Sequence, residues 1–177
     1  KIKKSKNEGL TPKGKLFLQG ILAILFLISM KQTVGISTAI QIPFTGMIID
    51  FGFLYYILSF LLLCGTVNAV NLTDGIDGLA STCVLTVGAF FTFVGVLKLE
   101  NIALIFLGSL LMGATLGFLV FNLHPAKIFM GDTGSLFFGA IVVGASFIIG
   151  NPLLVVIYGF VFMIEAASDI IQVVYFK

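Results

Sequence analysis

The sequence predicts an all-α polytopic membrane protein with about six transmembrane helices and one short hairpin outside them. Of its 177 residues, 59% are hydrophobic and only 10% are charged, whereas a soluble domain has roughly 45–50% apolar and about 25% charged residues. The formal net charge of +2 and the apolar bias exclude a disordered chain and a nucleic-acid-binding arm. A chain of this composition therefore folds with the lipid bilayer as its solvent.

Six apolar segments, separated by charged or turn-forming residues, are each interpreted as a helix. A hydrocarbon core about 30 Å thick needs roughly 20 residues for one helical crossing, so six such segments occupy most of the chain. The first and fifth are short, but Lys15 and Lys31, at the ends of the first, can extend their ammonium groups to the interface. The predicted spans are 16–30, 51–70, 79–97, 102–121, 136–149 and 153–176, within a single domain over 1–177.

The long polar connection between the first two spans has a turn signal of its own. It runs from Lys31 to Asp50 and contains the tetrapeptide Pro43-Phe44-Thr45-Gly46. Proline and glycine at such positions favour a reversal of the chain, so this connection is expected to form a short β-hairpin or an irregular loop.

Six successive crossings place alternate connections on the same side of the membrane. Residues 1–15, the loops 71–78 and 122–135, and the carboxyl end share one side, whereas the hairpin and the loops near 98–101 and 150–152 share the other. Eight of the ten basic residues lie on the first side. The positive-inside rule then predicts that the first side is cytoplasmic and that the hairpin is extracytoplasmic.

Three aspartates gather on the predicted cytoplasmic side although they are far apart in the sequence. Asn71, Asp74 and Asp77 recur every three positions, which places them roughly along one face of a helical turn. Asp132 lies in the other loop, within a Gly-Asp-Thr-Gly-Ser string whose backbone N–H groups can face an anion. The short-loop geometry of Asp-Gly pairs is the alternative explanation for these residues.

These loops offer the ligands of a magnesium site. Mg²⁺ takes one or two carboxylates and leaves its other positions to water and substrate phosphate, and Lys1, Lys13 and Lys127 can pair with phosphate oxygens. A zinc site is excluded for this sequence, which has a single histidine, His124, and no thiolate cluster. Cys64 and Cys83 lie in apolar segments without C-x-x-C spacing, so packing within the membrane is the favoured role of both thiols.

Other residues keep more than one interpretation. Phe129 is either an anchor at the membrane interface or a stacking platform for a ring. His124, which precedes a proline, is a loop residue or a base. Glu165 and Asp169 lie within the last apolar segment and should face the bundle interior or a wet cavity; packing, a proton path and substrate access all remain open for them.

Four segments of the chain closely resemble the phospho-N-acetylmuramoyl-pentapeptide-transferase family, within the polyprenyl-phosphate hexose-1-phosphate transferase superfamily. They are KNEGLTPKGKLFLQ (6–19), NAVNLTDGIDGLA (68–80), FNLHPAKIFMGDTGSL (121–136) and DIIQVVYFK (169–177). The resemblance implies a bundle of about ten helices, of which this chain would be the middle six, in the bacterial plasma membrane with the active site facing the cytoplasm. It also implies UDP-MurNAc-pentapeptide and undecaprenyl phosphate as substrates, lipid I and UMP as products, and a requirement for Mg²⁺.

The resemblance also implies roles for individual residues. Asp132 resembles the metal-ligating aspartate, and it would be catalytic together with Asp74 and Asp77. The residues expected to bind substrate are Asn71, Asn122, Phe129, Lys1 and Lys13. Among these, Phe129 would stack on uracil and Lys1 would complete an Asp-Asp-x-x-Lys motif. The Asp-Asp pair is expected before Lys1 and a histidine-rich loop after Lys177. Without them this piece alone is expected to be inactive.

The mechanism expected from these features is direct attack of the lipid phosphate on the β-phosphate of the UDP-sugar. The nearest alternative is a sister UDP-GlcNAc:polyprenyl-phosphate GlcNAc-1-phosphate transferase with a similar site. An ion-coupled transporter, suggested by Glu165 and Asp169, and a purely structural subunit are alternatives from other classes. The expected partners are these substrates and membrane lipid, with no nucleic acid, and a homodimer is left open.

Overall fold

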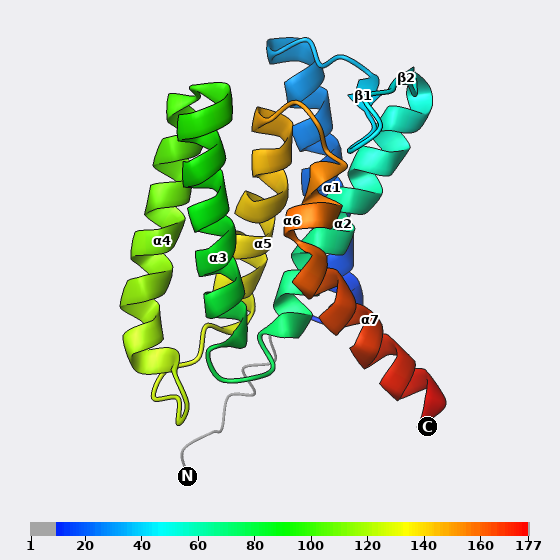
Figure 1. Ribbon diagram of the computed structural model, residues 1–177. Coiled ribbons are helices and arrows are strands. Elements are labelled where there is room, and N and C mark those ends of the chain that lie inside the picture. The colour runs from blue at the N-terminus through cyan, green and yellow to red at the C-terminus, as the bar shows by residue number, and fades with distance from the viewer. Residues whose placement is uncertain (1–9, 177) are drawn as a thin grey trace.

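Long helices lie side by side in a computed structural model that describes residues 10–176, apart from the side chains of residues 98 and 99 (Figure 1). Two short strands and a broken carboxyl-terminal helix complete the described part. In chain order the elements are α1 (Pro12–Thr33), β1 (Ala39–Gln41), β2 (Ile48–Asp50), α2 (Phe53–Thr73), α3 (Leu79–Val94) with a π-helical turn, η1 (Gly95–Leu99), α4 (Ile102–Asn122), α5 (Gly131–Ile148), α6 (Leu154–Tyr158) and α7 (Phe160–Tyr175).

Helices α1 to α5 are long and apolar enough to cross a bilayer, which confirms the predicted all-α polytopic class. Large apolar side chains such as Phe17, Phe106 and Val120 are exposed on their outer faces. Helices satisfy their own backbone hydrogen bonds, so they can present such faces to lipid. The first five predicted spans each coincide with one of these helices, although α5 already begins at Gly131.

The predicted sixth span differs from the structure. Residues 153–176 form two helices, α6 and α7, which are separated at Gly159. The backbone of Gly159 leaves the helical region there, with φ −94° and ψ 12°, and a Cβ on this residue would lie 2.6 Å from the carbonyl oxygen of Val155. Each piece is shorter than a bilayer crossing, and α7 leans away from the other helices (Figure 1).

Close approaches of backbone hold the bundle together. A Cβ added to Gly108 of α4 would lie 2.6 Å from the carbonyl oxygen of Gly88 on α3, and one added to Gly139 of α5 would lie 2.8 Å from the Cα of Val67 on α2. Small residues allow membrane helices to pack this tightly. Buried Phe91 joins these pairs of helices in one apolar core with Val142 and its neighbours.

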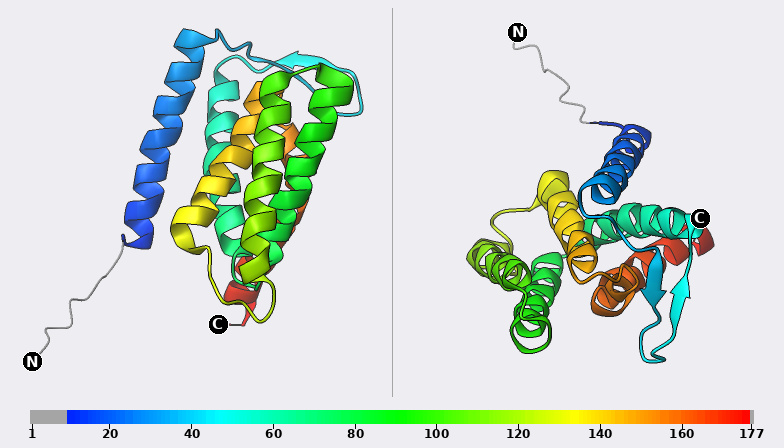
Figure 2. Two further views of the ribbon diagram at one scale, coloured as in Figure 1. Left: turned by 90° about the vertical axis from the view of Figure 1, so that its left-hand side faces the viewer. Right: turned by 90° about the horizontal axis from the view of Figure 1, so that it is seen from above.

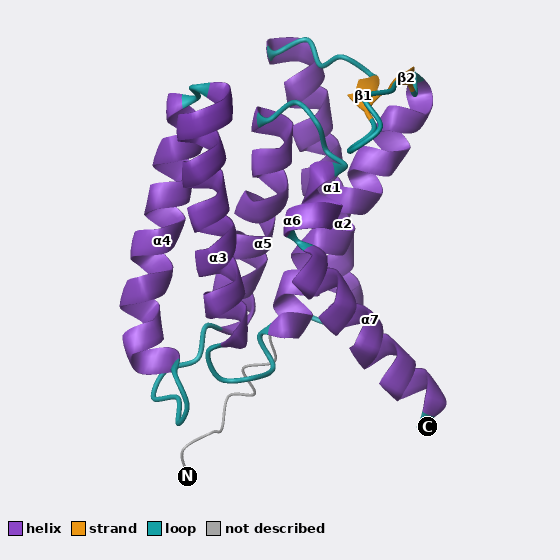
Figure 3. Cartoon of the chain, viewed as in Figure 1, coloured by secondary structure: helices purple, strands orange, loops and turns teal. Residues whose placement is uncertain are grey.

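The connections divide between the two ends of the bundle as the crossing order predicts. The α2–α3 and α4–α5 loops lie at one end, and the α3–α4 and α5–α6 connections lie at the other with the β1–β2 hairpin (Figures 1 and 2). The hairpin itself is confirmed: β1 and β2 are antiparallel, with Ile40 opposite Ile49 (Figure 3). Which end faces the cytoplasm stays a prediction.

Candidate functional site

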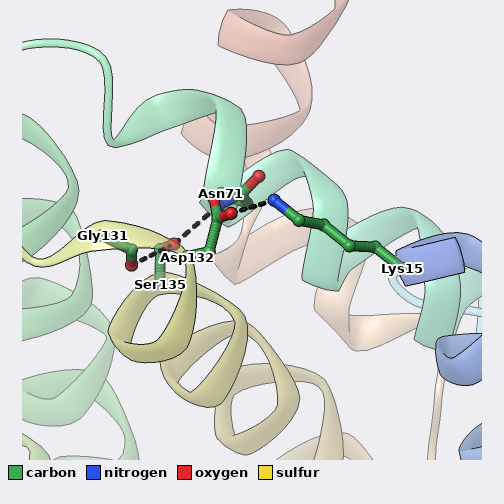
Figure 4. Close-up of polar contacts among 5 residues, drawn as sticks. All are labelled: Lys15, Asn71, Gly131, Asp132 and Ser135. Carbon is green, nitrogen blue, oxygen red and sulfur yellow. Dashed lines mark hydrogen bonds and ion pairs between the residues drawn. The ribbon is translucent and has the colours of Figure 1, made fainter. Parts of the chain in front are cut away.

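Three helices meet at Asp132, at the end of the bundle that carries the α2–α3 and α4–α5 loops (Figure 4). The ammonium of Lys15, from the first turn of α1, forms an ion pair with Oδ2 of Asp132. From the last turn of α2, Nδ2 of Asn71 donates to Oδ1 of Asp132 (3.1 Å) and to Oγ of Ser135 (2.7 Å). The Ser135 hydroxyl in turn donates to the carbonyl oxygen of Gly131 (2.9 Å).

The Asp132 carboxylate is held in place but stays accessible. Its side chain is 53% exposed, and that of Lys15 is 31% exposed. Asp132 lies in the first turn of α5, where the unpaired N–H groups and the helix dipole favour a negative charge. A bound cation can therefore reach this carboxylate from the solvent.

Asp74 lies beside this cluster, where it caps the end of α2. Partial burial raises the pKa of its carboxyl above the ordinary value, and a hydrogen bond from the backbone N–H of Gly131 opposes that increase. The hydrogen bond ties the α2–α3 loop to the residue immediately before Asp132. Asp74 thus borders the Asp132 site without joining its carboxylate.

Asp77 belongs to a separate contact between the two loops. Its Oδ2 accepts a hydrogen bond from the backbone N–H of Ala126 (3.0 Å) and lies 3.2 Å from Nδ1 of His124. Its carboxylate thereby links the α2–α3 loop to the start of the α4–α5 loop. His124 itself is highly exposed, with a side chain 86% accessible.

Asn122 connects the same two loops from inside the protein. Its Oδ1 accepts hydrogen bonds from the N–H of Gly78 (3.2 Å) and the hydroxyl of Ser81 (3.0 Å), and its Nδ2 donates to the carbonyl oxygen of Ile128 (3.0 Å). The residue is only 3% exposed. The structure therefore shows Asn122 in a loop-positioning arrangement, and its direct contact with substrate stays a prediction.

The remaining predicted substrate contacts have different surroundings. Phe129 is 71% exposed in the α4–α5 loop, with its ring available to a ligand or to the membrane interface. Lys13 is exposed on α1 and makes no hydrogen bond or ion pair with another described residue. Lys1 lies outside the described residues.

The structure brings Asn71 and Asp132 together as the sequence indicated, but it does not bring three carboxylates onto one cation. Among residues 10–176, no group of three or more His, Cys, Asp or Glu side chains is placed to hold a metal. The reason is that Asp77 is directed to the N–H of Ala126 instead of toward Asp132. The role of Asp132 as a metal-ligating carboxylate stays a prediction.

Lys15, which forms an ion pair with Asp132, was not among the predicted site residues, whereas the role of Lys13 in binding substrate stays a prediction. Residues two apart lie on nearly opposite sides of a helix, whereas residues four apart share a face. Lys15 shares its face with Gln19 and Ala23, and Ala23 is buried. This i, i+4, i+8 pattern was the available signal that Lys15, and not Lys13, points into the bundle.

An apolar cavity of about 410 Å³ lies between α1, α2 and α5 next to this site. Its lining is almost wholly apolar, with Leu18, Leu22 and Phe137 among the contributors, and Lys15 and Gln19 supply its polar groups. Oε1 of Gln19 accepts a hydrogen bond from Nδ2 of Asn68 (2.7 Å). The cavity therefore joins an apolar volume at membrane depth to the ion pair at the end of the bundle.

The fold and the site define an integral membrane protein with a one-carboxylate polar centre at one end of its helices and an apolar cavity beside it. The model of glycosyl transferase family 4 matches residues 7–150, and the chain belongs to this family. Over the whole chain it is 44% identical to the phospho-N-acetylmuramoyl-pentapeptide-transferase of Halalkalibacterium halodurans, 46% to that of Bacillus cytotoxicus and 44% to that of Bacillus subtilis. The chain spans about half the length of these curated relatives, 54% of each.

Proposed function

We propose that the complete protein carrying this chain transfers phospho-MurNAc-pentapeptide from its UDP carrier to undecaprenyl phosphate, giving lipid I and UMP. The observation that carries the proposal is the position of Asp132, which is held by Asn71 of α2 and by Lys15 of α1, a residue that also lines an apolar cavity. The reaction joins a water-soluble sugar nucleotide to a lipid phosphate, so it needs a charged centre and an apolar volume in contact. The names of the relatives support the same reaction.

The cavity between α1, α2 and α5 suits the part of the acceptor's prenyl chain that lies next to its phosphate. A prenyl chain is apolar along its whole length, and the cavity offers about 410 Å³ lined by residues such as Leu22 and Phe26. Transfer of that chain to the cavity is favourable because its walls are apolar, and Lys15 at one wall supplies a cation for the lipid phosphate. On this proposal the phosphate lies close to Asp132.

The donor nucleotide is assigned to the outer surface of the α4–α5 loop. Phe129 is exposed there, three residues before Asp132 along the chain. A uracil ring stacked on this side chain would leave the pyrophosphate directed toward the start of α5, where backbone N–H groups and the helix dipole favour anions. Lys13 remains the proposed basic contact for the phosphates.

The residues present suit a magnesium ion. Asp132 supplies one half-exposed carboxylate, with Asn71 and Ser135 holding the surrounding geometry. One or two carboxylates with substrate phosphates and water are the ordinary ligands of Mg²⁺, so the absence of a three-carboxylate cluster among the described residues fits this ion. When bound, Mg²⁺ would offset negative charge on the pyrophosphate.

The proposed reaction is a direct displacement. An oxygen of the lipid phosphate attacks the β-phosphorus of the UDP-sugar, the bond from that phosphorus to the bridging oxygen breaks, and UMP leaves. A phosphate monoester is already largely ionised near neutral pH, since its second pKa is about 6, so no side chain is needed to deprotonate it. Lys15 and Asn71 contribute by positioning and by charge, which are the main sources of catalysis in such transfers.

The site does not favour the transporter alternative. A transporter predicts a midplane cavity between Glu165 and Asp169. The cavity beside the Asp132 site is instead lined by α1, α2 and α5, and a second cavity is lined by α1 and α2, without Glu165 or Asp169 in either lining. We therefore place the protein among the transferases of the bacterial plasma membrane. The Asp132 end is proposed to face the cytoplasm because the crossing order assigns eight of the ten lysines to that side.

The proposal is tested by measuring UMP release from the complete protein in detergent with UDP-MurNAc-pentapeptide, undecaprenyl phosphate and Mg²⁺. Asp132→Asn should nearly abolish turnover, whereas Asp50→Asn, which removes an exposed carboxylate on the hairpin at the other end, should leave it unchanged. Full activity of the Asp132 variant would contradict the proposal. Competition with UDP-GlcNAc distinguishes the sister transferase, and a trapped phospho-sugar on the enzyme would contradict direct attack.

A further inference from the structure

Lys15 contacts two parts of the proposed site, the carboxylate of Asp132 and the apolar cavity. Its ammonium forms an ion pair with Asp132, the carboxylate proposed to hold the metal. The same side chain lines the apolar cavity proposed for the acceptor lipid. Lys15 is thus the described residue that touches both the metal position and the acceptor position.

The ion pair and a bound divalent cation exclude each other at Asp132. Oδ2 is occupied by the Lys15 ammonium and Oδ1 by the amide of Asn71. A divalent cation that binds this carboxylate replaces the ammonium as its counter-charge and repels it at short range. Lys15 must then move to a different anion or to water.

The cavity wall offers a position for such an anion. One helical turn from Lys15, Gln19 also lines the cavity, and its Nε2 is buried with no hydrogen-bond partner among the described residues. Asn68 fixes the other end of this amide by donating to Oε1 (2.7 Å). A buried donor without a partner is unfavourable, so this N–H group can donate to an acceptor that residues 10–176 do not supply.

We propose that Lys15 is an exchangeable counter-ion, which neutralises Asp132 until a divalent cation binds there and then pairs with the acceptor's phosphate monoester beside Gln19. The inference deepens the proposed function and rests on it for the identity of the acceptor. Each event favours the other: the cation releases Lys15 to the phosphate, and the phosphate withdraws Lys15 from Asp132. By linkage, the two ligands then raise each other's affinity by the same factor.

The test is a calorimetric titration of Mg²⁺ into the complete protein in detergent, with and without farnesyl phosphate as the probe for the acceptor. Lys15→Met removes the competitor for Asp132, so without farnesyl phosphate the Kd for Mg²⁺ should fall by about two- to fivefold, the range that a partly exposed ion pair contributes. Farnesyl phosphate should tighten Mg²⁺ binding to the unmodified protein more than to Lys15→Met, because only the unmodified protein also gains from the transfer of Lys15 to the phosphate.

Two controls separate the ion pair from general charge effects. Lys127→Met removes an exposed lysine from the α4–α5 loop at the same end of the bundle and should change the Kd for Mg²⁺ much less. Gln19→Leu should leave Mg²⁺ binding unchanged without farnesyl phosphate and should weaken the coupling when it is present. This variant keeps the proposal testable if Lys15→Met does not fold.

Unchanged or weaker Mg²⁺ binding by Lys15→Met would overturn the proposal, as would an equal gain in Lys127→Met or an equal effect of farnesyl phosphate on the unmodified protein and on Lys15→Met. Retention of the full coupling by Gln19→Leu would overturn the part assigned to the cavity. UMP release is measured on the unmodified protein in parallel. If no UMP is released, the proposed function is contradicted, and the Mg²⁺ titrations still test the role of Lys15 as a counter-ion. If UMP is released but the Kd for Mg²⁺ is the same in all variants, only the role of Lys15 is contradicted.

Discussion

Replacement of Asn122 by alanine should loosen the two loops that carry the candidate site. The substitution removes hydrogen bonds to Gly78, Ser81 and Ile128, and two of these partners, Gly78 and Ser81, are buried. At about 1 kcal/mol net for each hydrogen bond, the free energy of unfolding should fall by about 3 kcal/mol. This cost is large because no other described side chain is shown to replace the lost partners.

The measurement is denaturant or thermal unfolding of the complete protein in detergent, with UMP release followed in parallel. Ser81→Ala is the matched control, because it removes only one of the three hydrogen bonds and should cost about 1 kcal/mol. An Asn122→Ala protein as stable as Ser81→Ala would refute the positioning role. Unchanged stability with a large rise in KM would instead show that Asn122 acts mainly by contacting substrate.

Three further predictions concern packing, stacking and burial. Gly108→Ala should cost about 1–3 kcal/mol in unfolding experiments, because its Cβ would lie 2.5 Å from Oγ1 of Thr92, whereas Gly113→Ala, with open space around it, should be tolerated. Phe129→Ala should raise KM for the UDP-sugar by about five- to a hundredfold, the usual value of one base stacked on an aromatic ring, with no change in Tm. Burial raises the pKa of Asp74, so its stabilising contribution is present at acid pH and is lost as the pH rises through the folded-state pKa; Asp74→Asn should therefore raise Tm at neutral pH and give no gain near pH 3.

The spans and their order could be predicted because length and hydrophobicity alone decide them. The first five apolar segments are helices, and the loops at 71–78 and 122–135 lie at the same end of the bundle, as the crossing order required. Length and hydrophobicity did not predict the break at Gly159. An apolar run of sufficient length indicates that a segment is buried in lipid or protein, but not that its helix is continuous.

The sequence predicted which residues lie at the candidate site better than it predicted the contacts between them. Asp132 and Asn71 meet, but Asp77 is taken up by the N–H of Ala126, and a main-chain partner of this kind carries no signature in the sequence. The family resemblance indicated Lys13 and not Lys15, because a motif match carries no information on which side of a helix faces its neighbours. Which side of α1 faces the bundle depends on the packing of α2 and α5 against it.

The contact between Gly139 and Val67 affects the geometry of the candidate site from a distance of one helical turn. On α5, Gly139 lies one turn deeper than Ser135, and on α2, Val67 lies one turn deeper than Asn71. The spacing of the two backbones at that depth thus sets how far the Asn71 amide stands from its hydroxyl partner. A substitution at this buried glycine should consequently disturb the contact between Asn71 and Ser135 from a position that no water-soluble ligand reaches.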